Sequence, residues 1–581
     1  MLARLQESPL QFLTSGTRDV PARQQTLRNA VQWSYDLLDA DEKKMFRWLA
    51  VFVGGCALEA AQSVVGSPAS MDDLESLVSK SLLRQTETEG APRLTMLETI
   101  REFGLEQLTR TQELEAARHA HADYYLSFVE EAEVHLTGAD QKVWLKRLDR
   151  EQDNLRAALG WAIEHHAGEL AQRMTGALQP FWFARGYWSE GRRWLEEALA
   201  LDTDATPAPA IRAKALYGAG LLARYQGDAA RARILCEQSL ALYRGLSDQS
   251  GVVMTLVQLA RIGRFQDDQT AMQAFLAEAV ALIDALPDTV VKADAYVDMV
   301  IAQLNPSALQ PPPEAARYLA ESERIQRALN NPAGLAFAIA HQANLALMEG
   351  DDSRAASRFD VAERMAIELG DDRILGRLAL SRLPLDLRTG DFSAARRRLD
   401  NSLQQASQRG DRHLPSMLTM LVVLLHGQGL SVWAARVFGL VEALPQSGHL
   451  NEEAVAFWQR LGIGDIRAEV RAQLGEEAFA REISSGQRLR LEDLLAIPHP
   501  QGPASAQAGP PSAPGASLTA REIEVLHLLA QDLSSSQIAE RLVVSRRTVD
   551  AHLRSIYDKL GVKSRDAAIR VARERGLISG L

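Results

Sequence analysis

The chain has 581 residues, too many for one hydrophobic core, and so predicts several domains. Its 46% hydrophobic and 24% charged residues are ordinary for a folded protein, which argues against disorder throughout. We find no apolar run of membrane-spanning length and no secretory signal, and therefore expect a cytoplasmic protein without a membrane partner. The only cysteines, Cys56 and Cys236, lack metal-type spacing and are expected to be buried, inert thiols.

Charge is unevenly distributed along the chain. The net charge is −11, which by itself argues against a nucleic-acid partner. Residues 517–581, however, hold nine arginines and two lysines against eight acidic residues, a balance of +3, whereas residues 1–516 carry −14. This asymmetry indicates a nucleic-acid module joined to an acidic body of another kind.

The first 112 residues predict short helices and one β-hairpin. Apolar periodicity indicates helices over Gln24–Leu38 and Glu42–Val53, the second ending at Gly54. LEAAQSVV and MDDLESLVSKSLLRQ predict two more helices, a hairpin is expected around Glu89-Gly90, and TIREFGLEQL returns to helix. This order is typical of a winged-helix-like domain, which we place within residues 1–112.

Residues 113–168 are interpreted as a helical connector. Four histidines in this segment lack companion ligands at metal-binding spacing and are expected at the surface: His119, His121, His165 and His166.

Residues 169–445 repeat with a period of about 40 residues. Turn signals recur at Gly186-Tyr187, Gly227-Asp228, Asp267-Asp268, Gly350-Asp351 and Gly390-Asp391, and one is lost near Pro306. Amphipathic segments precede and follow these turns. Helical hairpins at a fixed period are typical of an α-solenoid, in which each hairpin buries its apolar face only against its neighbours.

Small residues within these hairpins predict close helix packing: Ala215, Gly218, Ala219, Gly220 and Ala232. Trp182, Trp188 and Trp194 are expected to pack in the core. The pattern resembles tetratricopeptide repeats with longer connections, which implies a concave surface for a partner or ligand. A scaffold without a ligand of its own is the alternative. Residues 446–497 are expected to form a helical cap, and the Pro/Ala/Gly/Ser-rich residues 498–516 a flexible linker.

Residues 517–581 predict four short helices. Thr519 and Glu522 form a capping box for the first, Ser534 or Ser535 caps the second, Ser545 caps the third, and Arg565 begins the fourth. The apolar positions expected inside are Ile523, Leu526, Leu529, Ala530, Ile538, Ala539, Leu542, Val549, Leu553, Ile556 and Leu560. A short helix, a tight turn and a longer capped helix are typical of a helix-turn-helix DNA-binding unit.

This segment resembles the LuxR-type (GerE-like) helix-turn-helix, whose pattern stands here as LTAREIEVLHLLA, QIAERL and SRRTVDAHLRSIYDKLGVKSR. The resemblance implies phosphate contacts from Ser545, Arg546, Arg547, Thr548, His552, Lys559, Lys563 and Ser564. It implies base-facing positions at Asp550, Ala551 and Arg554. Asp532, Ser535 and Asp550 depart from the residues usual in the family, and the third of these leaves the sequence preference open.

Residues 9–165 and the repeats resemble large regulators of the signal-transduction ATPase class, in which a nucleotide-binding domain precedes the winged helix. Residues 1–112 would then include the end of such a domain. No GxxxxGK[ST] phosphate loop occurs, so we expect no nucleotide cofactor and no enzymatic activity. Either the chain is a fragment of a longer protein, which we favour, or it is a regulator without that domain.

The sequence therefore predicts a mainly α protein: a winged-helix-like domain, a tetratricopeptide-like α-solenoid, a flexible linker and a four-helix LuxR-type domain at residues 517–581. We expect a sequence-specific transcriptional regulator that binds promoter DNA as a homodimer, with the solenoid sensing a small molecule or protein. RNA polymerase is a further candidate partner. The alternative is an α-solenoid adaptor whose helix-turn-helix serves dimerisation or docking.

Overall fold

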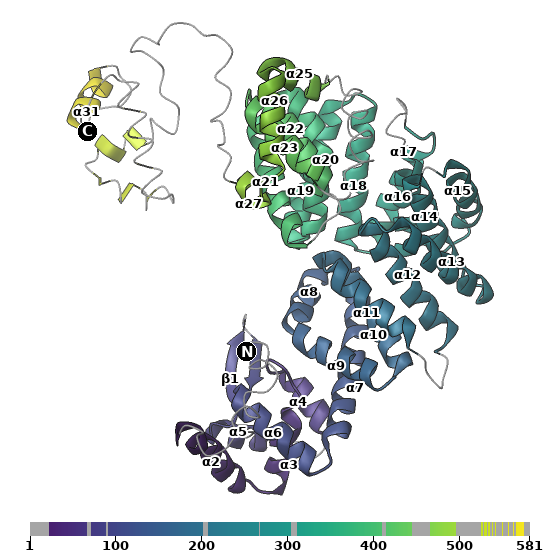
Figure 1. Cartoon of the computed structure of the whole chain (residues 1–581), viewed down its shortest axis with the longest axis vertical. Coiled ribbons are helices and arrows are strands. Elements are labelled where there is room, and N and C mark those ends of the chain that lie inside the picture. Colours follow the sequence, from purple (N-terminus) through teal and green to yellow (C-terminus); the bar gives the residue numbers. More distant parts are fainter. Residues whose placement is uncertain are drawn as a thin grey trace. The chain divides into compact units, whose positions relative to one another are not determined.

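The computed structural model describes residues 22–66, 71–88, 91–201, 207–266, 268–303, 311–409, 414–443 and 465–495, and in the C-terminal segment 525, 526, 528–530, 533, 534, 537, 538, 541, 549, 553, 556, 562 and 565–574. These residues are helical apart from one two-stranded antiparallel hairpin, as the sequence predicts (Figure 1). The chain divides into two compact units, residues 1–501 and 502–581.

The N-terminal region is a small helical domain with one hairpin. Its elements are α2 (Ala22–Asp36), α3 (Ala40–Leu49), α4 (Leu58–Val65), α5 (Met71–Ser79), β1 (Arg84–Thr88), β2 (Ala91–Thr95) and α6 (Glu98–Arg110). The two strands pair antiparallel on either side of Glu89-Gly90, as predicted. Tyr35, Phe46 and Phe103 form the centre of the core, with ring centroids 5.4, 5.6 and 6.3 Å apart in tilted and edge-on pairs.

Two helices of this region end earlier than the sequence predicts. α3 ends at Leu49 rather than Val53, because the chain must then reach the hairpin, where Cys56 exchanges two 2.9 Å backbone hydrogen bonds with Leu94. Gly55 has a φ of +85°, and a Cβ there would lie 2.4 Å from the Leu94 carbonyl oxygen. α5 ends at Ser79, because the residues expected to prolong it enter β1.

Three helices follow: α7 (Leu114–His135), α8 (Gln141–Arg150) and α9 (Gln152–Glu164). Contrary to the sequence-based expectation, His121 is buried, because α7 packs its ring against Phe52 and Tyr125. His119 lies at the surface beside Asp123, as expected.

Helical hairpins come next in the chain (Figure 1), and the described residues form seven of them. They are α10 (Gly168–Arg185) with α11 (Trp188–Ala200), α12 (Pro209–Tyr225) with α13 (Ala229–Gly245), α14 (Gln249–Phe265) with α15 (Gln269–Ile283), α16 (Val290–Gln303) with α17 (Ala315–Ala328), α18 (Pro332–Met348) with α19 (Asp352–Leu369), α20 (Asp372–Thr389) with α21 (Phe392–Arg409), and α22 (Leu414–Gly427) with α23 (Ser431–Ala443). Each packs on the next, which is the predicted solenoid.

The turn signals read from the sequence lie between the helices of these hairpins. Gly227, Gly350 and Gly390 have positive φ, which closes the preceding helix. The acidic residue that follows then caps the next helix: Asp228 accepts from the Arg231 backbone N–H at 3.1 Å, and Asp351 from that of Arg354 at 2.9 Å. A two-residue signal therefore both ends one helix and starts another.

Small residues allow the helices to approach closely, as predicted. A Cβ on Gly218 would lie 2.9 Å from Gln179 Cγ, and one on Gly220 would lie 2.6 Å from the Cys236 sulfur. Three helices follow the hairpins: α25 (Ile466–Leu474), α26 (Glu476–Gly486) and α27 (Leu491–Leu495). They cover the apolar side chains of the last hairpins. There α26 crosses α23 at two glycines, because a Cβ on Gly439 or Gly486 would strike the backbone of the opposite helix.

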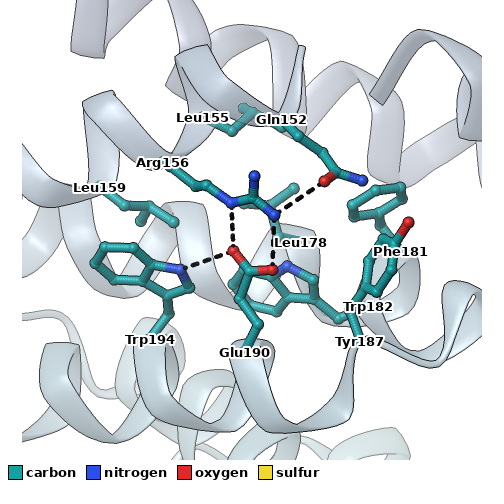
Figure 2. Close-up of a pocket in the computed structure, with 10 residues that line it drawn as sticks. All are labelled: Gln152, Leu155, Arg156, Leu159, Leu178, Phe181, Trp182, Tyr187, Glu190 and Trp194. Atoms are coloured by element: carbon teal, nitrogen blue, oxygen red, sulfur yellow. Dashed lines mark hydrogen bonds and ion pairs between the residues drawn. The ribbon is translucent and has the colours of Figure 1, made fainter. Parts of the chain in front are cut away.

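The tryptophans of the first hairpin pack in the core, as predicted. All three are buried: Trp182 and Trp194 lie where α9, α10 and α11 meet, and Trp188 packs against Tyr225 of α12. Figure 2 shows Glu190 held there by Arg156 at 2.7 Å and by the Trp194 indole at 3.5 Å. The cavity between these side chains measures about 10 Å³, which is room for a single water and not for a ligand.

Candidate functional site

The described residues of the C-terminal unit include its buried core. The residues of this core are Val525, Leu526, Leu528, Leu529, Ile538, Val549, Leu553, Ile556, Ala568 and Ala572. Val549, Leu553 and Ile556 follow one another at spacings of four and three, so they share one face of a helix, as predicted. α31 (Arg565–Glu574) packs its alanines against this face, and Arg565 donates a 3.1 Å hydrogen bond to the Leu529 carbonyl oxygen.

Ser534 forms the N-cap that the sequence left open between Ser534 and Ser535. The Ser534 hydroxyl accepts from the Gln537 backbone N–H at 3.4 Å, and the Gln537 side-chain oxygen accepts from the Ser534 backbone N–H at 2.9 Å. This reciprocal pair is a capping box. It fixes where the second helix of the unit begins.

The residues predicted to contact DNA lie outside the described part of the chain. They are Ser545, Arg546, Arg547, Thr548, Asp550, Ala551, His552, Arg554, Lys559, Lys563 and Ser564. Their roles therefore stay predictions. The structure describes buried residues of the same segment, namely Val549, Leu553 and Ile556.

A second candidate site is a cavity of about 500 Å³ in the first unit. The first helices of five successive hairpins line it: α10, α12, α14, α16 and α18. Its walls combine apolar and aromatic side chains, such as Phe183, Leu221 and Met254, with polar ones, such as Gln179 and Asn331. A cavity of this size accommodates a small organic molecule.

Arg224, Arg261 and Asp298 are among the charged side chains that line this cavity. The Arg224 Nε donates to the Gln258 side-chain oxygen at 2.9 Å, and the Gln258 amide donates to Asp298 at 3.0 Å. Arg261 forms an ion pair with the same Asp298. From α20, Arg377 approaches the Tyr225 hydroxyl at 3.4 Å. We call Arg224, Tyr225, Arg261, Asp298 and Arg377 the Arg224 cluster.

The field of the Arg224 cluster is positive at Tyr225. Burial alone would raise the pKa of this phenol, but Arg261, Arg377 and Arg224 outweigh burial and Asp298 and lower the pKa to about 6. Burial and the neighbouring Arg261 likewise lower the pKa of Arg224. This cluster could not be predicted from the sequence, because its members come from four helices, α12, α14, α16 and α20, and nothing in the sequence indicates that they meet.

Comparison with known proteins bears on both units. Residues 516–572 match the model of the bacterial regulatory proteins of the luxR family, and residues 38–109 match that of a winged helix-turn-helix domain. A protein named as an HTH-type transcriptional regulator in Mycobacterium tuberculosis is 26% identical, over 97% of this chain and 77% of that protein. The nitrate/nitrite response regulator NarP of Escherichia coli is 52% identical over 60 residues, which cover 10% of this chain and 28% of NarP.

The chain carries a LuxR-type helix-turn-helix domain. The protein is a DNA-binding transcriptional regulator. Among solved structures, a signal-transduction ATPase with a tetratricopeptide repeat sensor from Pyrococcus horikoshii aligns with a TM-score of 0.46 at 14% identity, covering 83% of this chain and 67% of that one.

In this regulator a buried polar cluster joins the N-terminal hairpin to α7 and α9. Arg93 on β2 pairs with Glu151 and donates to the Gly54 and Gly55 carbonyl oxygens at 3.1 and 2.8 Å. Glu151 also accepts from the Tyr125 hydroxyl at 2.6 Å and from the Asn154 amide at 2.8 Å. The Asn154 side-chain oxygen accepts from the Val53 backbone N–H at 2.7 Å.

We call Arg93, His121, Tyr125, Glu151 and Asn154 the Arg93 cluster. His121 Nε2 lies 3.4 Å from the Asn154 side-chain oxygen, and burial lowers the pKa of this imidazole to about 4. The histidine is therefore neutral at physiological pH.

Three observations concern membrane spans, metal ligands and cysteines in the described part of the chain. No helix in the described part of the chain is both long and apolar enough to cross a membrane. The described residues contain no group of three or more His, Cys, Asp or Glu that could hold a metal ion. Both cysteines are buried thiols, as predicted, and burial raises the pKa of Cys236 to about 12.

Proposed function

We propose that the C-terminal domain binds promoter DNA through its third helix. The observation that carries this proposal is the buried stripe of Val549, Leu553 and Ile556. A helix that turns these three side chains inward turns Asp550, Ala551 and Arg554 away from the core, because successive helical residues are about 100° apart. Arg554 would read bases, whereas Arg546 and Arg547, at the start of the helix, would hold phosphates.

The other phosphate contacts proposed are those of Ser545, Thr548, His552, Lys559, Lys563 and Ser564. We further propose that two copies bind two half-sites about one helical turn apart. A domain this small binds weakly alone, so association of the bodies would raise the affinity. RNA polymerase is a proposed partner of the bound dimer.

The solenoid is the proposed sensor. Its support is the cavity of about 500 Å³ among the first helices of the hairpins. The proposed organisation keeps the boundaries expected from the sequence: residues 1–112, 113–168, 169–445, 446–497, 498–516 and 517–581. The linker would let the DNA-binding domain act at a distance from the sensor.

Replacement of Arg546 and Arg547 by alanine in the full-length protein tests the DNA-binding proposal. We expect affinity for a duplex to fall about tenfold or more at physiological salt, and the salt dependence to drop by about two ions, since each phosphate contact releases roughly one counterion. The measurement is a fluorescence-anisotropy titration at four salt concentrations.

Arg570→Ala is the control for lost charge, because Arg570 lies on the exposed face of α31. Unchanged affinity and salt dependence in the double variant would disprove the helix assignment. If the wild-type protein itself showed no salt-dependent duplex binding, the adaptor function would be favoured instead.

A further inference from the structure

The inner helices of the solenoid form a closed ring. The first helices of six successive hairpins contact one another in order, α10, α12, α14, α16, α18 and α20, and α20 then returns to contact α10. In a solenoid each hairpin packs on its neighbours in the sequence, so the contact between the first and the sixth hairpin is an additional one. The cavity of about 500 Å³ is lined by the first five helices of this ring, together with the end of α7 and the start of α8.

Two hydrogen bonds between distant parts of the chain hold the ring closed. The Lys142 ammonium on α8 donates to the Glu368 carbonyl oxygen on α19 at 2.7 Å, and Arg377 on α20 donates to the Tyr225 hydroxyl on α12 at 3.4 Å. We call these two hydrogen bonds the closing contacts. Both adjoin the cavity, because Lys142 directly follows the lining residue Gln141, and Tyr225 is itself part of the lining. Separation at the closing contacts would therefore move two walls of the cavity.

Arg377 joins two sides of the ring. Its guanidinium carbon lies 5.2 Å from the ring centroid of Phe337 on α18, and the same side chain reaches the Tyr225 hydroxyl on α12. Phe337 and Tyr225 both line the cavity. Because α14 and α16 separate α12 from α18 in the ring, this single side chain connects lining residues from helices that are not neighbours.

Opening the ring at the closing contacts would cost little. Lys142 and Glu368 are exposed, and hydrogen bonds between exposed groups contribute little to stability. The packing of each hairpin on its neighbours in the sequence would remain intact. The two helices that meet at the closure, α10 and α20, also contain Pro180 and Pro384 within them, and an internal proline removes a helical hydrogen bond and lets the helix bend.

We propose that the ring of inner helices opens and closes at the closing contacts and that this movement controls access to the cavity. In the closed ring, Lys142 holds α8 against α19, and Arg377 holds Tyr225 and Phe337 together. In the open ring, α20 separates from α10 and α12, and a molecule enters the cavity between them. This inference rests on the proposed sensor role of the solenoid and specifies how that sensor is regulated.

Thiol labelling of the full-length protein tests this movement. Met254→Cys places a thiol in the cavity, whereas the native Cys56 and Cys236 are buried and serve as the background. Ile234→Cys places a thiol at an exposed position of α13 as the reference. We expect fluorescein-5-maleimide to label Met254→Cys at least about tenfold more slowly than Ile234→Cys, because the reagent reaches the cavity only when the ring opens.

Removal of a closing contact should then speed the labelling of the cavity thiol. Lys142→Met or Arg377→Met, each combined with Met254→Cys, should raise the rate about threefold or more, because the open ring becomes more populated. Lys142→Arg keeps a charged donor and should keep the slow rate. Arg244→Met is the matched control for a lost surface cation, since Arg244 pairs with Glu278 between adjacent hairpins, and it should leave the rate unchanged.

A distance measurement makes the test independent of the cavity thiol. Spin labels at Val143→Cys and Ile367→Cys, both exposed, lie beside the two residues of the first closing contact. Pulsed electron–electron double resonance should show a longer distance that gains population in Arg377→Met and not in Arg244→Met. Distances and labelling rates that stay unchanged in Arg377→Met overturn the proposal. Equal labelling of Met254→Cys and Ile234→Cys in the otherwise wild-type protein also overturns it.

Duplex binding by the same variants separates this inference from the proposed function. We expect Lys142→Met and Arg377→Met to bind the duplex, because the residues proposed to contact DNA lie in the other unit. A ring that never opens, together with intact duplex binding, would reject this inference alone. A ring that opens in a protein that binds no duplex would reject the DNA-binding function alone. Opening that leaves the duplex affinity unchanged would support the movement and reject its role in sensing.

Discussion

Two clusters in this regulator bury arginine side chains, and they differ in how the charge is satisfied. In the Arg93 cluster, the guanidinium donates to one carboxylate and to backbone carbonyl oxygens, and the carboxylate accepts from further partners. In the Arg224 cluster, three arginines converge on one tyrosine and one shared carboxylate. The first is balanced within the protein, and in the second Arg224 and Arg261 repel each other.

The difference concerns how much each cluster contributes to stability. A balanced network of buried hydrogen bonds holds its elements in one arrangement, here the hairpin against α7 and α9. In the Arg224 cluster, burial and the neighbouring Arg261 both disfavour the charge of Arg224, so removing that guanidinium also removes a repulsion. The two clusters should therefore respond in opposite ways when a charge is removed.

Glu151→Ala should give the largest effect. It leaves Arg93 buried without its carboxylate, which typically costs about 3–5 kcal/mol. Native-state hydrogen exchange of the full-length protein should show lower protection in α4, α7 and α9, with α22 and α23 as an internal reference. Unchanged protection in α7 and α9 would mean that the Arg93 cluster does not hold these helices together.

Replacing an arginine by methionine should distinguish the clusters most directly. Arg93→Met removes hydrogen bonds to Glu151 and to two backbone carbonyl groups, so we expect destabilisation by several kcal/mol. Arg224→Met removes a buried charge from a positive field, so we expect the stability to stay within about 1 kcal/mol or to rise. Both are measured by thermal unfolding and hydrogen exchange. Equal destabilisation by the two changes would contradict the comparison.

The features that could be predicted from sequence are local ones. Gly227-Asp228 and Gly350-Asp351 determine a helix end and a helix start within two residues, so the hairpins followed from the sequence. The spacing of Val549, Leu553 and Ile556 likewise predicted the buried face of the third helix.

The two clusters could not be predicted, because they depend on contacts between distant segments. Arg93 and Glu151 meet only when the hairpin packs on α9, and nothing near either residue indicates the other. Arg224, Arg261 and Arg377 come from α12, α14 and α20, and in the sequence each looks like one more surface charge of its own helix. His121 was wrongly expected at the surface for the same reason, since its burial comes from Phe52 and Asn154.

His121 gives a smaller effect than Glu151 or Arg93 and makes the Arg93 cluster sensitive to pH. Its pKa is about 4 in the folded protein and roughly 6.5 in an unfolded chain. Between these values the unfolded chain binds the proton and the folded protein does not, so stability falls as the pH is lowered from about 6.5 towards 4. The loss between pH 7.5 and pH 5 should be about 1–2 kcal/mol.

Hydrogen exchange in α7 and α9 at the two pH values should show this loss in the wild-type protein and in His119→Gln, whose imidazole is exposed. In His121→Gln the pH-dependent loss should shrink, because the titrating group is gone. If His121→Gln kept the full loss of protection at pH 5, the titrating group would lie elsewhere, and the acid sensitivity would not belong to the Arg93 cluster.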